Sequence, residues 1–360
     1  MAQTDYDLSY LAVQCMAPNN ELLYDDKGKP SIMVKIPKMT YAQLGLGDFT
    51  DTFPAFIVDG LEKDCIWISK YQNIVQDGRA YSLPAQDPKT IITFDSAVAA
   101  CKAKGNGWHL MTKVEWALLA WWCKHNGTMP YGNNNYGKDT HETTYSAVPS
   151  MARDGSNRIR RVATGTGPVK WSHNWAADGI WDLNGNVFEW TSGIRTVYGE
   201  VQILANNNAA SPDANQAANS AQWMAIKASD GTLITPDGSG TTSGAVKMDW
   251  IDSKLVYSDT IVDAAKGGHG CQFNVITCDN TISAAAKLLL ASLGMTRIDE
   301  SDTAFDGDRF YFNNAQSEHF FSCGGNWDSD EPAGVFCSYG GYTRSSSGGP
   351  IGFRSAYYEA

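Results

Sequence analysis

The sequence has no long apolar run and no concentrated positive charge. Its most apolar stretch, Lys287–Met295, is far shorter than the roughly 20 residues that span a bilayer, so we expect no membrane insertion. Lys and Arg number 28 against 39 Asp and Glu, which gives a formal net charge of −11. The densest basic group, Arg158, Arg160 and Arg161, is short. A chain of this charge repels phosphate backbones, which argues against nucleic acid as a partner.

A secretory signal and paired cysteines are also missing. The N-terminal segment MAQTDYDLSYLAVQC is acidic where a signal peptide needs a positive start. We therefore expect synthesis in the cytoplasm without a signal peptide. The eight cysteines include no CxxC pair, which predicts mostly buried free thiols rather than a zinc site or a disulfide framework.

The residues that are present are typical of a folded, loop-rich protein. The 360 residues are 43% hydrophobic and 19% charged, with 34 glycines and 12 tryptophans. Disordered chains combine low hydrophobicity with high charge, so disorder of the whole chain is excluded.

Local patterns predict three helices. Asp95 or Ser96 can cap a helix that ends at Gly105. The sequence 112–115, Thr-Lys-Val-Glu, is a capping box, and apolar residues recur behind it with helical spacing as far as Gly127. A last helix is predicted over 282–293, strands are predicted from residue 32, over 56–60 and over 65–71, and residues 128–178 are predicted to be mostly loop.

Composition also divides the chain. Residues 1–35 contain turn signals and are predicted to form a leader or attachment segment before a single domain over 36–360. Within that domain, residues 205–280 begin with a tract rich in Asn, Ala, Ser and Gly. Because this tract lacks apolar periodicity, we expect residues 205–280 to be an insertion outside the core.

Three motifs that are far apart in sequence bear on function. They are WHLMTKVEW at 108–116, DLNGNVFEW at 182–190, and GGNW at 324–327 followed by AGVF at 333–336 and GFR at 352–354. Each motif alone is consistent with a structural role, because large aromatic side chains usually serve a core.

In this order the motifs resemble those of the formylglycine-generating-enzyme, or sulfatase-modifying-factor, family. The resemblance runs from about Ile36 to Arg354 and implies an α+β, C-type-lectin-like fold that is glycine-rich and largely irregular. Oxidase members of the family bind copper through a cysteine pair in the C-terminal segment, whereas here Cys337 has no second cysteine after it. We therefore expect no catalytic cofactor and no enzyme activity. An atypical oxygen-dependent oxidase is the alternative.

The chain also resembles another branch with this fold, the variable proteins of diversity-generating retroelements, which include phage tail-tip receptor-binding proteins. In that branch the region corresponding to 324–354 is the ligand-binding face, and it is rewritten at adenines in codons such as AAC. Changing the two adenines of AAC cannot produce Lys, Gln, Glu, Met or Trp, and residues 332–358 contain none of these. The alternative is an ordinary Gly/Ser-rich loop, although Ser, Tyr and Gly also dominate evolved binding loops.

This resemblance implies which residues contact the ligand and what the ligand is. The displayed residues would be Asn326, Asp328, Ser329, Ser338, Tyr339, Gly341, Tyr342, Ser346, Gly348 and Pro350. The implied function is non-catalytic binding of a host-surface receptor, protein or glycan, by a homotrimer at a phage or prophage tail tip. A bacterial surface ligand-binding protein is the alternative.

The family resemblance also implies a structural calcium site. Members of the family bind Ca²⁺ through an Asn, a Gly, an aliphatic residue and a Glu, which correspond here to Asp182, Gly185, Val187 and Glu189. The Asp that replaces the Asn is still an oxygen ligand suited to Ca²⁺. The alternative is that Glu189 pairs internally without a metal.

Overall fold

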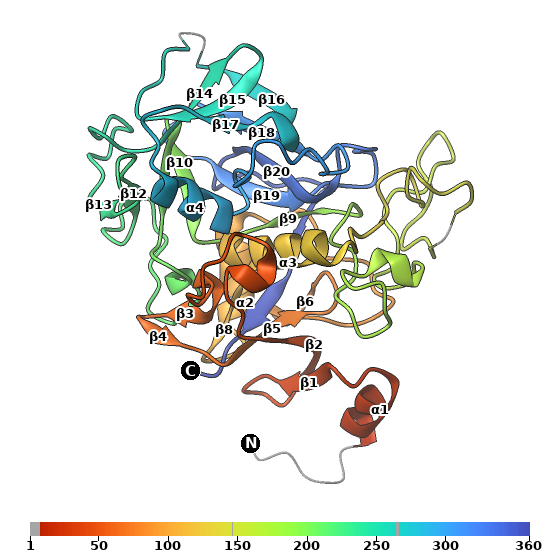
Figure 1. Cartoon of the computed structure of the whole chain (residues 1–360). Coiled ribbons are helices and arrows are strands. Elements are labelled where there is room, and N and C mark those ends of the chain that lie inside the picture. The colour runs from red at the N-terminus through yellow and green to blue at the C-terminus, as the bar shows by residue number, and fades with distance from the viewer. Residues whose placement is uncertain (1–7, 146, 264–265) are drawn as a thin grey trace.

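Helix α3 (Lys113–Asn126) lies in the middle of the molecule, between a five-stranded and a six-stranded sheet (Figure 1). The structure, a computed structural model, describes residues 8–145, 147–263 and 266–360. The other α-helices of the described residues are α1 (Leu8–Met16), α2 (Phe94–Lys102) and α4 (Ala284–Ser292). None of the helices in these ranges is long and apolar enough to cross a membrane.

The five-stranded sheet is antiparallel throughout and lies near the C-terminus in Figure 1. Its order is β1 (Asn20–Tyr24), β2 (Pro30–Pro37), β5 (Cys65–Ser69), β22 (Ser355–Tyr357) and β8 (Trp108–Leu110). Two small hairpins accompany it, β3 (Ile57–Val58) with β4 (Leu61–Glu62) and β6 (Ile74–Gln76) with β7 (Arg79–Tyr81). The sheet therefore joins strands from the two ends of the chain.

The six-stranded sheet carries the C-terminal motifs. Its order is β16 (Gly268–Gln272), β18 (Arg309–Asn313), β20 (Gly334–Tyr342), β19 (Phe320–Gly324), β9 (Phe188–Trp190) and β21 (Ile351–Phe353). The pairs β18–β20 and β9–β21 are parallel, and the others are antiparallel. All three motifs thus meet at this sheet and at α3 below it.

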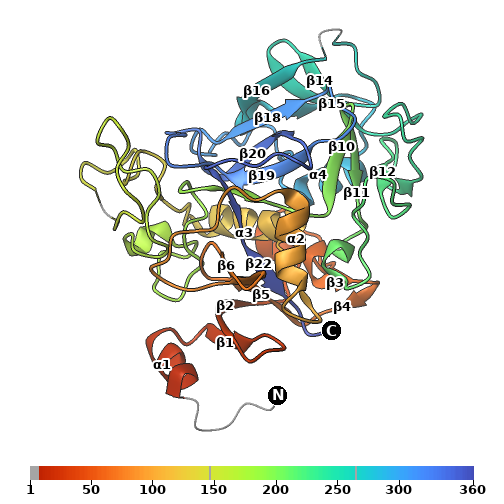
Figure 2. The ribbon, with the colours of Figure 1, turned by 180° about the vertical axis from the view of Figure 1, so that it is seen from behind.

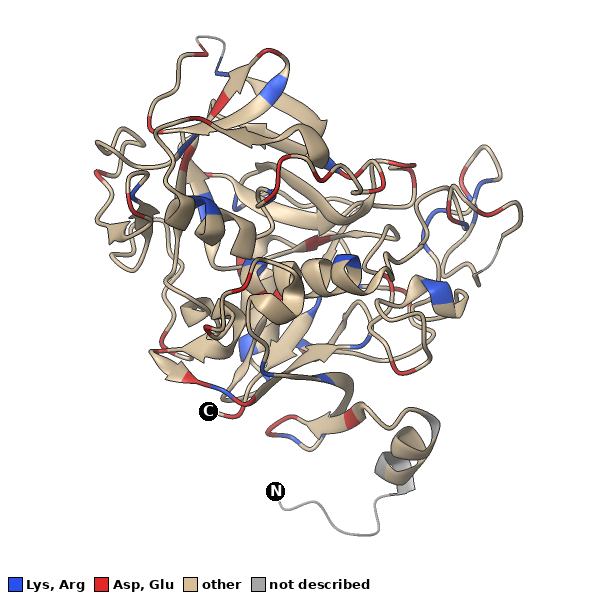
Figure 3. Cartoon of the chain, viewed as in Figure 1, with Lys and Arg blue, Asp and Glu red and all other residues tan. Residues whose placement is uncertain are grey.

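A third sheet has seven strands and is built mainly from residues 194–278. It contains β10 (Ile194–Val197), β11 (Glu200–Ile203), β12 (Met224–Ile226), β13 (Leu233–Ile234), β14 (Lys247–Ile251), β15 (Lys254–Ser258) and β17 (Thr277–Cys278). Figure 3 shows Lys and Arg scattered among Asp and Glu over the ribbon.

The expectation that residues 205–280 lie outside the core is wrong. Met248, Tyr257 and Phe273 are fully buried and belong to the main hydrophobic cluster together with residues of α3. Trp223 is 1% exposed and packs with Phe94 of α2 in a second cluster. The polar tract supplies loops, and the apolar residues between its turns supply the core.

The boundary predicted at residue 35 falls inside β2, which pairs with β5 from Met33 to Pro37. Strand β1 extends the same sheet, and Leu22 on β1 is buried. Residues 20–37 are therefore integrated with the domain. An attachment role for residues 1–35 stays a prediction, and residues 1–7 lie outside the described ranges.

The helix signals placed α2, α3 and α4 within a few residues, whereas α1 was not predicted. The capping box of α3 is confirmed, because Thr112 accepts the N–H of Glu115 and Glu115 accepts the N–H of Thr112. Gly127 ends α3 with φ +66°. Helix α2, on the rear of the molecule (Figure 2), is capped by Thr93 rather than by Asp95 or Ser96. The thiol prediction is also confirmed, since the cysteines are free and most of them are buried.

Candidate ligand-binding surface

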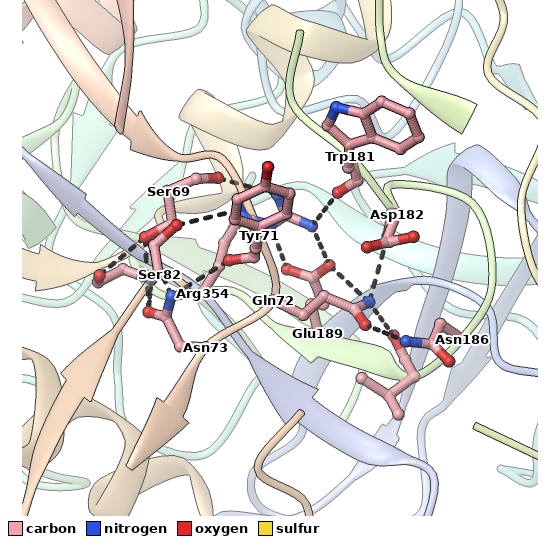
Figure 4. Close-up of polar contacts among 12 residues, drawn as sticks. Ser69, Tyr71, Gln72, Asn73, Ser82, Trp181, Asp182, Asn186, Glu189 and Arg354 are labelled. Carbon is pink, nitrogen blue, oxygen red and sulfur yellow. Dashed lines mark hydrogen bonds and ion pairs between the residues drawn. The ribbon is translucent and has the colours of Figure 1, made fainter. Parts of the chain in front are cut away.

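A buried ion pair fixes the GFR motif to the second motif. Arg354 is 0% exposed, and its Nε and Nη2 atoms each donate to a carboxylate oxygen of Glu189 at 2.6 Å. The same guanidinium donates to the carbonyl oxygens of Ser69 and Trp181 at 3.0 Å (Figure 4). Bidentate Arg–carboxylate pairs are geometrically specific, so this pair anchors the chain just after residue 350.

Two glycines anchor the other end of residues 326–350, which we call the display segment. Gly324 and Gly325 have φ values of +90° and +79°, a region that residues with a Cβ rarely adopt. A Cβ on Gly325 would lie 2.5 Å from the Cβ of Ala333, so glycine allows the GG and AG pairs to meet. The Gly324 carbonyl accepts the N–H of Gly185 at 2.8 Å, which ties this end to the second motif.

Strand β20, inside the display segment, presents alternate residues to opposite faces. Phe336 packs against Trp121 of α3, with ring centroids 4.8 Å apart. Ser338 also points toward α3, because its Oγ accepts from Lys113 Nζ at 2.7 Å. Tyr339 follows Ser338 on the other face, where it is half-buried. The side of β20 that carries Phe336 and Ser338 thus faces the core, and Tyr339 faces outward.

Aromatic rings gather on this outer face. Tyr339 stacks on Tyr311 of β18 with centroids 4.5 Å apart and planes 6° from parallel, because the two residues are register partners in the parallel pair. Phe188 of β9 and Tyr342 lie 5.8 Å and 4.5 Å from the Tyr339 ring. A hollow of about 300 Å³ opens beside the Tyr311–Tyr339 stack. We call this hollow the aromatic groove, and its lining is Phe188, Arg309, Tyr311, Ser329, Pro332, Cys337, Ser338 and Tyr339.

Most of the predicted contact residues reach the surface. Asp328 is exposed, and the partly exposed ones are Ser329, Tyr339, Gly341, Tyr342, Ser346, Gly348 and Pro350. Ser346 Oγ accepts the N–H of Thr343 at 3.0 Å, and Gly348 O accepts the N–H of Ile91 at 3.0 Å. The loop after β20 is therefore ordered by its own turn and by a contact to the body.

Two of the predicted residues are not displayed. Ser338 is 1% exposed because the period of the strand turns it toward Lys113. Asn326 is 7% exposed, and its Nδ2 donates to Asp328 Oδ1 at 2.7 Å. Ser338 forms part of the groove floor, whereas Asn326 closes the turn after the two glycines.

Three residues of the groove lie outside the region that the sequence singled out as the binding face. Phe188 belongs to the second motif, and Arg309 and Tyr311 belong to β18. The β18 sequence RFYFN alternates, and its burial pattern follows the same period, with Phe310 and Phe312 inward. That alternation indicates outward-facing Arg309 and Tyr311, but only the sheet register places them beside Tyr339.

The comparisons with known proteins decide the family. The model of the sulfatase-modifying factor enzyme 1-like domain family matches residues 39–231, more than half of the chain. The chain belongs to this family. Membership confirms the α+β, C-type-lectin-like fold class with much irregular structure. The match ends before the display segment, residues 326–350. A search of curated proteins found no match to the chain.

Three solved structures are similar at low identity. Treponema denticola variable protein 1 is 12% identical with a TM-score of 0.36, over 95% of this chain and 100% of that chain. PvdO from Pseudomonas aeruginosa is 13% identical with a TM-score of 0.31, over 94% and 98%. The Major Tropism Determinant U1 variant is 10% identical with a TM-score of 0.28, over 94% and 71%.

The two cysteines nearest the C-terminal motifs of this sulfatase-modifying-factor-like chain are buried. Cys323 Sγ lies 3.2 Å from Lys113 Nζ and 3.7 Å from Ser338 Oγ. Burial raises the pKa of the Cys337 thiol, which disfavours the thiolate that binds metals. Among the described residues, no three His, Cys, Asp or Glu side chains are grouped as a metal site would require.

The oxygens expected to bind calcium do converge, but on a side-chain amide. Gln72 Nε2 donates to the carbonyl oxygens of Asp182, Gly185 and Val187 and to Glu189 Oε1, at 3.1, 3.4, 3.2 and 3.0 Å. The Asp182 carboxylate instead accepts the N–H of Gly165 at 2.9 Å. Its burial raises the pKa of Asp182 to about 6. With Gln72 in this position, these residues do not fit a Ca²⁺ ion.

Proposed function

We propose that this family member is a non-catalytic display protein that binds a receptor or other ligand at the aromatic groove and the display segment. The observation that carries the proposal is the division of the segment into a fixed frame and an open face. The Arg354–Glu189 pair and the two glycines fix its ends. Tyr339 and Tyr342 lie partly exposed between those ends.

The chemistry of the groove suits recognition without a reaction. Tyrosine offers a large contact area at low rotamer entropy and a hydroxyl group for hydrogen bonds. Tyr311 and Tyr339 hold each other's rings in place by stacking, so little ordering is needed when a ligand binds. Arg309 is exposed at the rim and adds a fixed positive charge.

The same division supports diversification of the segment by a retroelement. Substitutions at solvent-facing positions usually change stability little, whereas buried positions carry the large costs. The absence of Lys, Gln, Glu, Met and Trp from residues 332–358 fits rewriting of AAC-type codons. A host-surface receptor, protein or glycan, is then the partner, and a homotrimer at a phage or prophage tail tip is the setting. A bacterial surface ligand-binding protein would use the same groove.

Binding to whole cells tests the proposal. Fluorescently labelled chain is applied to a panel of bacterial strains, and the strain that binds it is retested with Tyr339→Ala and Tyr311→Ala. A hot-spot tyrosine contributes about 2 kcal/mol or more, so both variants should bind at least about 30-fold more weakly. Tyr145→Ala, an exposed tyrosine of the 128–178 loop region, is the control and should bind as the wild type does. Normal binding by both groove variants would refute the proposal.

A further inference from the structure

Four oxygen atoms from the second motif point at one nitrogen atom, Gln72 Nε2. Three are main-chain carbonyls, of Asp182, Gly185 and Val187, and the fourth is Glu189 Oε1. An amide nitrogen has two hydrogens, so these must be shared among the four acceptors. Gln72 is 0% exposed. Figure 4 shows the amide between Glu189 and the loop around Asn186.

The orientation of the Gln72 amide is determined by its other atom. Gln72 Oε1 accepts from Asn186 Nδ2 at 2.8 Å. Asn186 is itself oriented by Val162, whose N–H donates to Asn186 Oδ1 at 2.9 Å. A flipped Gln72 would turn its oxygen toward four other oxygens. The network therefore assigns Nε2, and with it the donor role, to the side that faces the second motif.

The Glu189 charge beside the amide is already paired. Glu189 is paired through both carboxylate oxygens with Arg354, so a divalent cation here would lie beside a guanidinium of the same sign. The contacts of 3.0 to 3.4 Å are hydrogen-bond lengths, whereas Ca²⁺ holds oxygen at about 2.3–2.6 Å. A neutral donor satisfies the converging oxygens without adding charge.

We propose that the Gln72 amide takes the place of a structural cation in this chain, so that the frame under the aromatic groove is held together without metal. Phe188, which lines the groove, lies between two of the tethered residues, Val187 and Glu189. One uncharged side chain thereby fixes the strand that carries the groove wall. This inference concerns the frame and does not depend on what the groove binds.

Metal analysis and thermal melts of the full chain test this inference. Protein purified in calcium-containing buffer is analysed for bound calcium, then melted in chelator and in millimolar Ca²⁺. Gln72→Met removes both N–H groups while keeping the side-chain volume. The matched control is Gln86→Met, because the Gln86 amide makes a single exposed bond to Pro84 O.

We expect no bound calcium, equal wild-type midpoints in both buffers, and a midpoint several degrees lower for Gln72→Met than for Gln86→Met. Stoichiometric calcium, or a wild-type midpoint that rises with Ca²⁺, would overturn the inference. Equal midpoints for the two variants would overturn it as well. Should Gln72→Met not fold at all, the metal content and melts of the wild type decide the question alone.

Discussion

Replacing Arg354 by Met removes the ion pair on which the C-terminal motif depends. The substitution keeps a long side chain in a position that is fully buried. It deletes four hydrogen bonds, two to Glu189 and one each to the carbonyls of Ser69 and Trp181. The Glu189 carboxylate then loses both donors from Arg354 and keeps the hydrogen bond from Gln72 Nε2.

The expected cost follows from that burial. Removing one partner of a buried pair costs about 3–5 kcal/mol, because the other charge is left uncompensated. The Glu189→Met/Arg354→Met double variant removes both charges, and well-packed apolar replacements of buried pairs are close to neutral. We therefore expect the double variant to be more stable than Arg354→Met alone. If the costs of the two single substitutions simply added, the double variant would be less stable than either single variant.

Urea unfolding followed by tryptophan fluorescence measures these costs. A loss of about 3–5 kcal/mol lowers the midpoint by at least about 1 M at ordinary slopes. The control is Arg158→Met, which breaks a surface pair with Asp154 at 2.9 Å and should cost under about 1 kcal/mol. If Arg354→Met cost no more than this control, or if the double variant were the least stable, the assigned role of the pair would be refuted.

Three further predictions concern the display segment and its support. Gly325→Ala should destabilise the folded chain by about 2–4 kcal/mol, because Gly325 has a positive φ and an added Cβ would lie 2.5 Å from the Cβ of Ala333. A urea midpoint like that of the wild type would contradict this. Burial raises the pKa of Asp308 well above its usual value, so its contribution to stability is complete at low pH and is lost as pH rises from about 4 toward the native pKa. The stability of Asp308→Asn relative to wild type should therefore increase between pH 5 and pH 8, and a constant difference in urea midpoints would contradict the assignment. Tyr342 packs on buried Trp190 with centroids 5.6 Å apart, so Tyr342→Ala should cost about 2 kcal/mol while Tyr342→Phe costs little, and equal melting midpoints for the two would count against this packing.

Local signals were enough to predict α2, α3, α4 and the frame, although they missed α1. The Thr112–Glu115 box and Gly127 bound α3 because capping depends on neighbouring residues alone. The cap of α2 was misplaced because Thr93, Asp95 and Ser96 are all able to cap, and only the backbone shows that Thr93 accepts the N–H. Glycine pairs and the GFR motif indicated where the display segment is anchored.

Long-range packing could not be predicted from the sequence. The apolar residues of 205–280, among them Met248 and Tyr257, are separated by polar turns, and no local period shows that they face the main core. Tyr311 joins Tyr339 only through the parallel register of β18 with β20. Gln72 is 110 positions or more from the oxygens that it binds, so nothing local marks it as their partner.

The DNA that flanks the gene tests the central claim most directly. Sequencing it in several isolates should show a near-copy of codons 324–354 beside a reverse-transcriptase gene. Differences between isolates should fall on partly exposed positions such as Tyr339 and Ser346, and they should spare Gly324, Gly325 and Arg354. The absence of any such copy, together with substitutions spread evenly over buried and exposed positions, would contradict a diversified display surface.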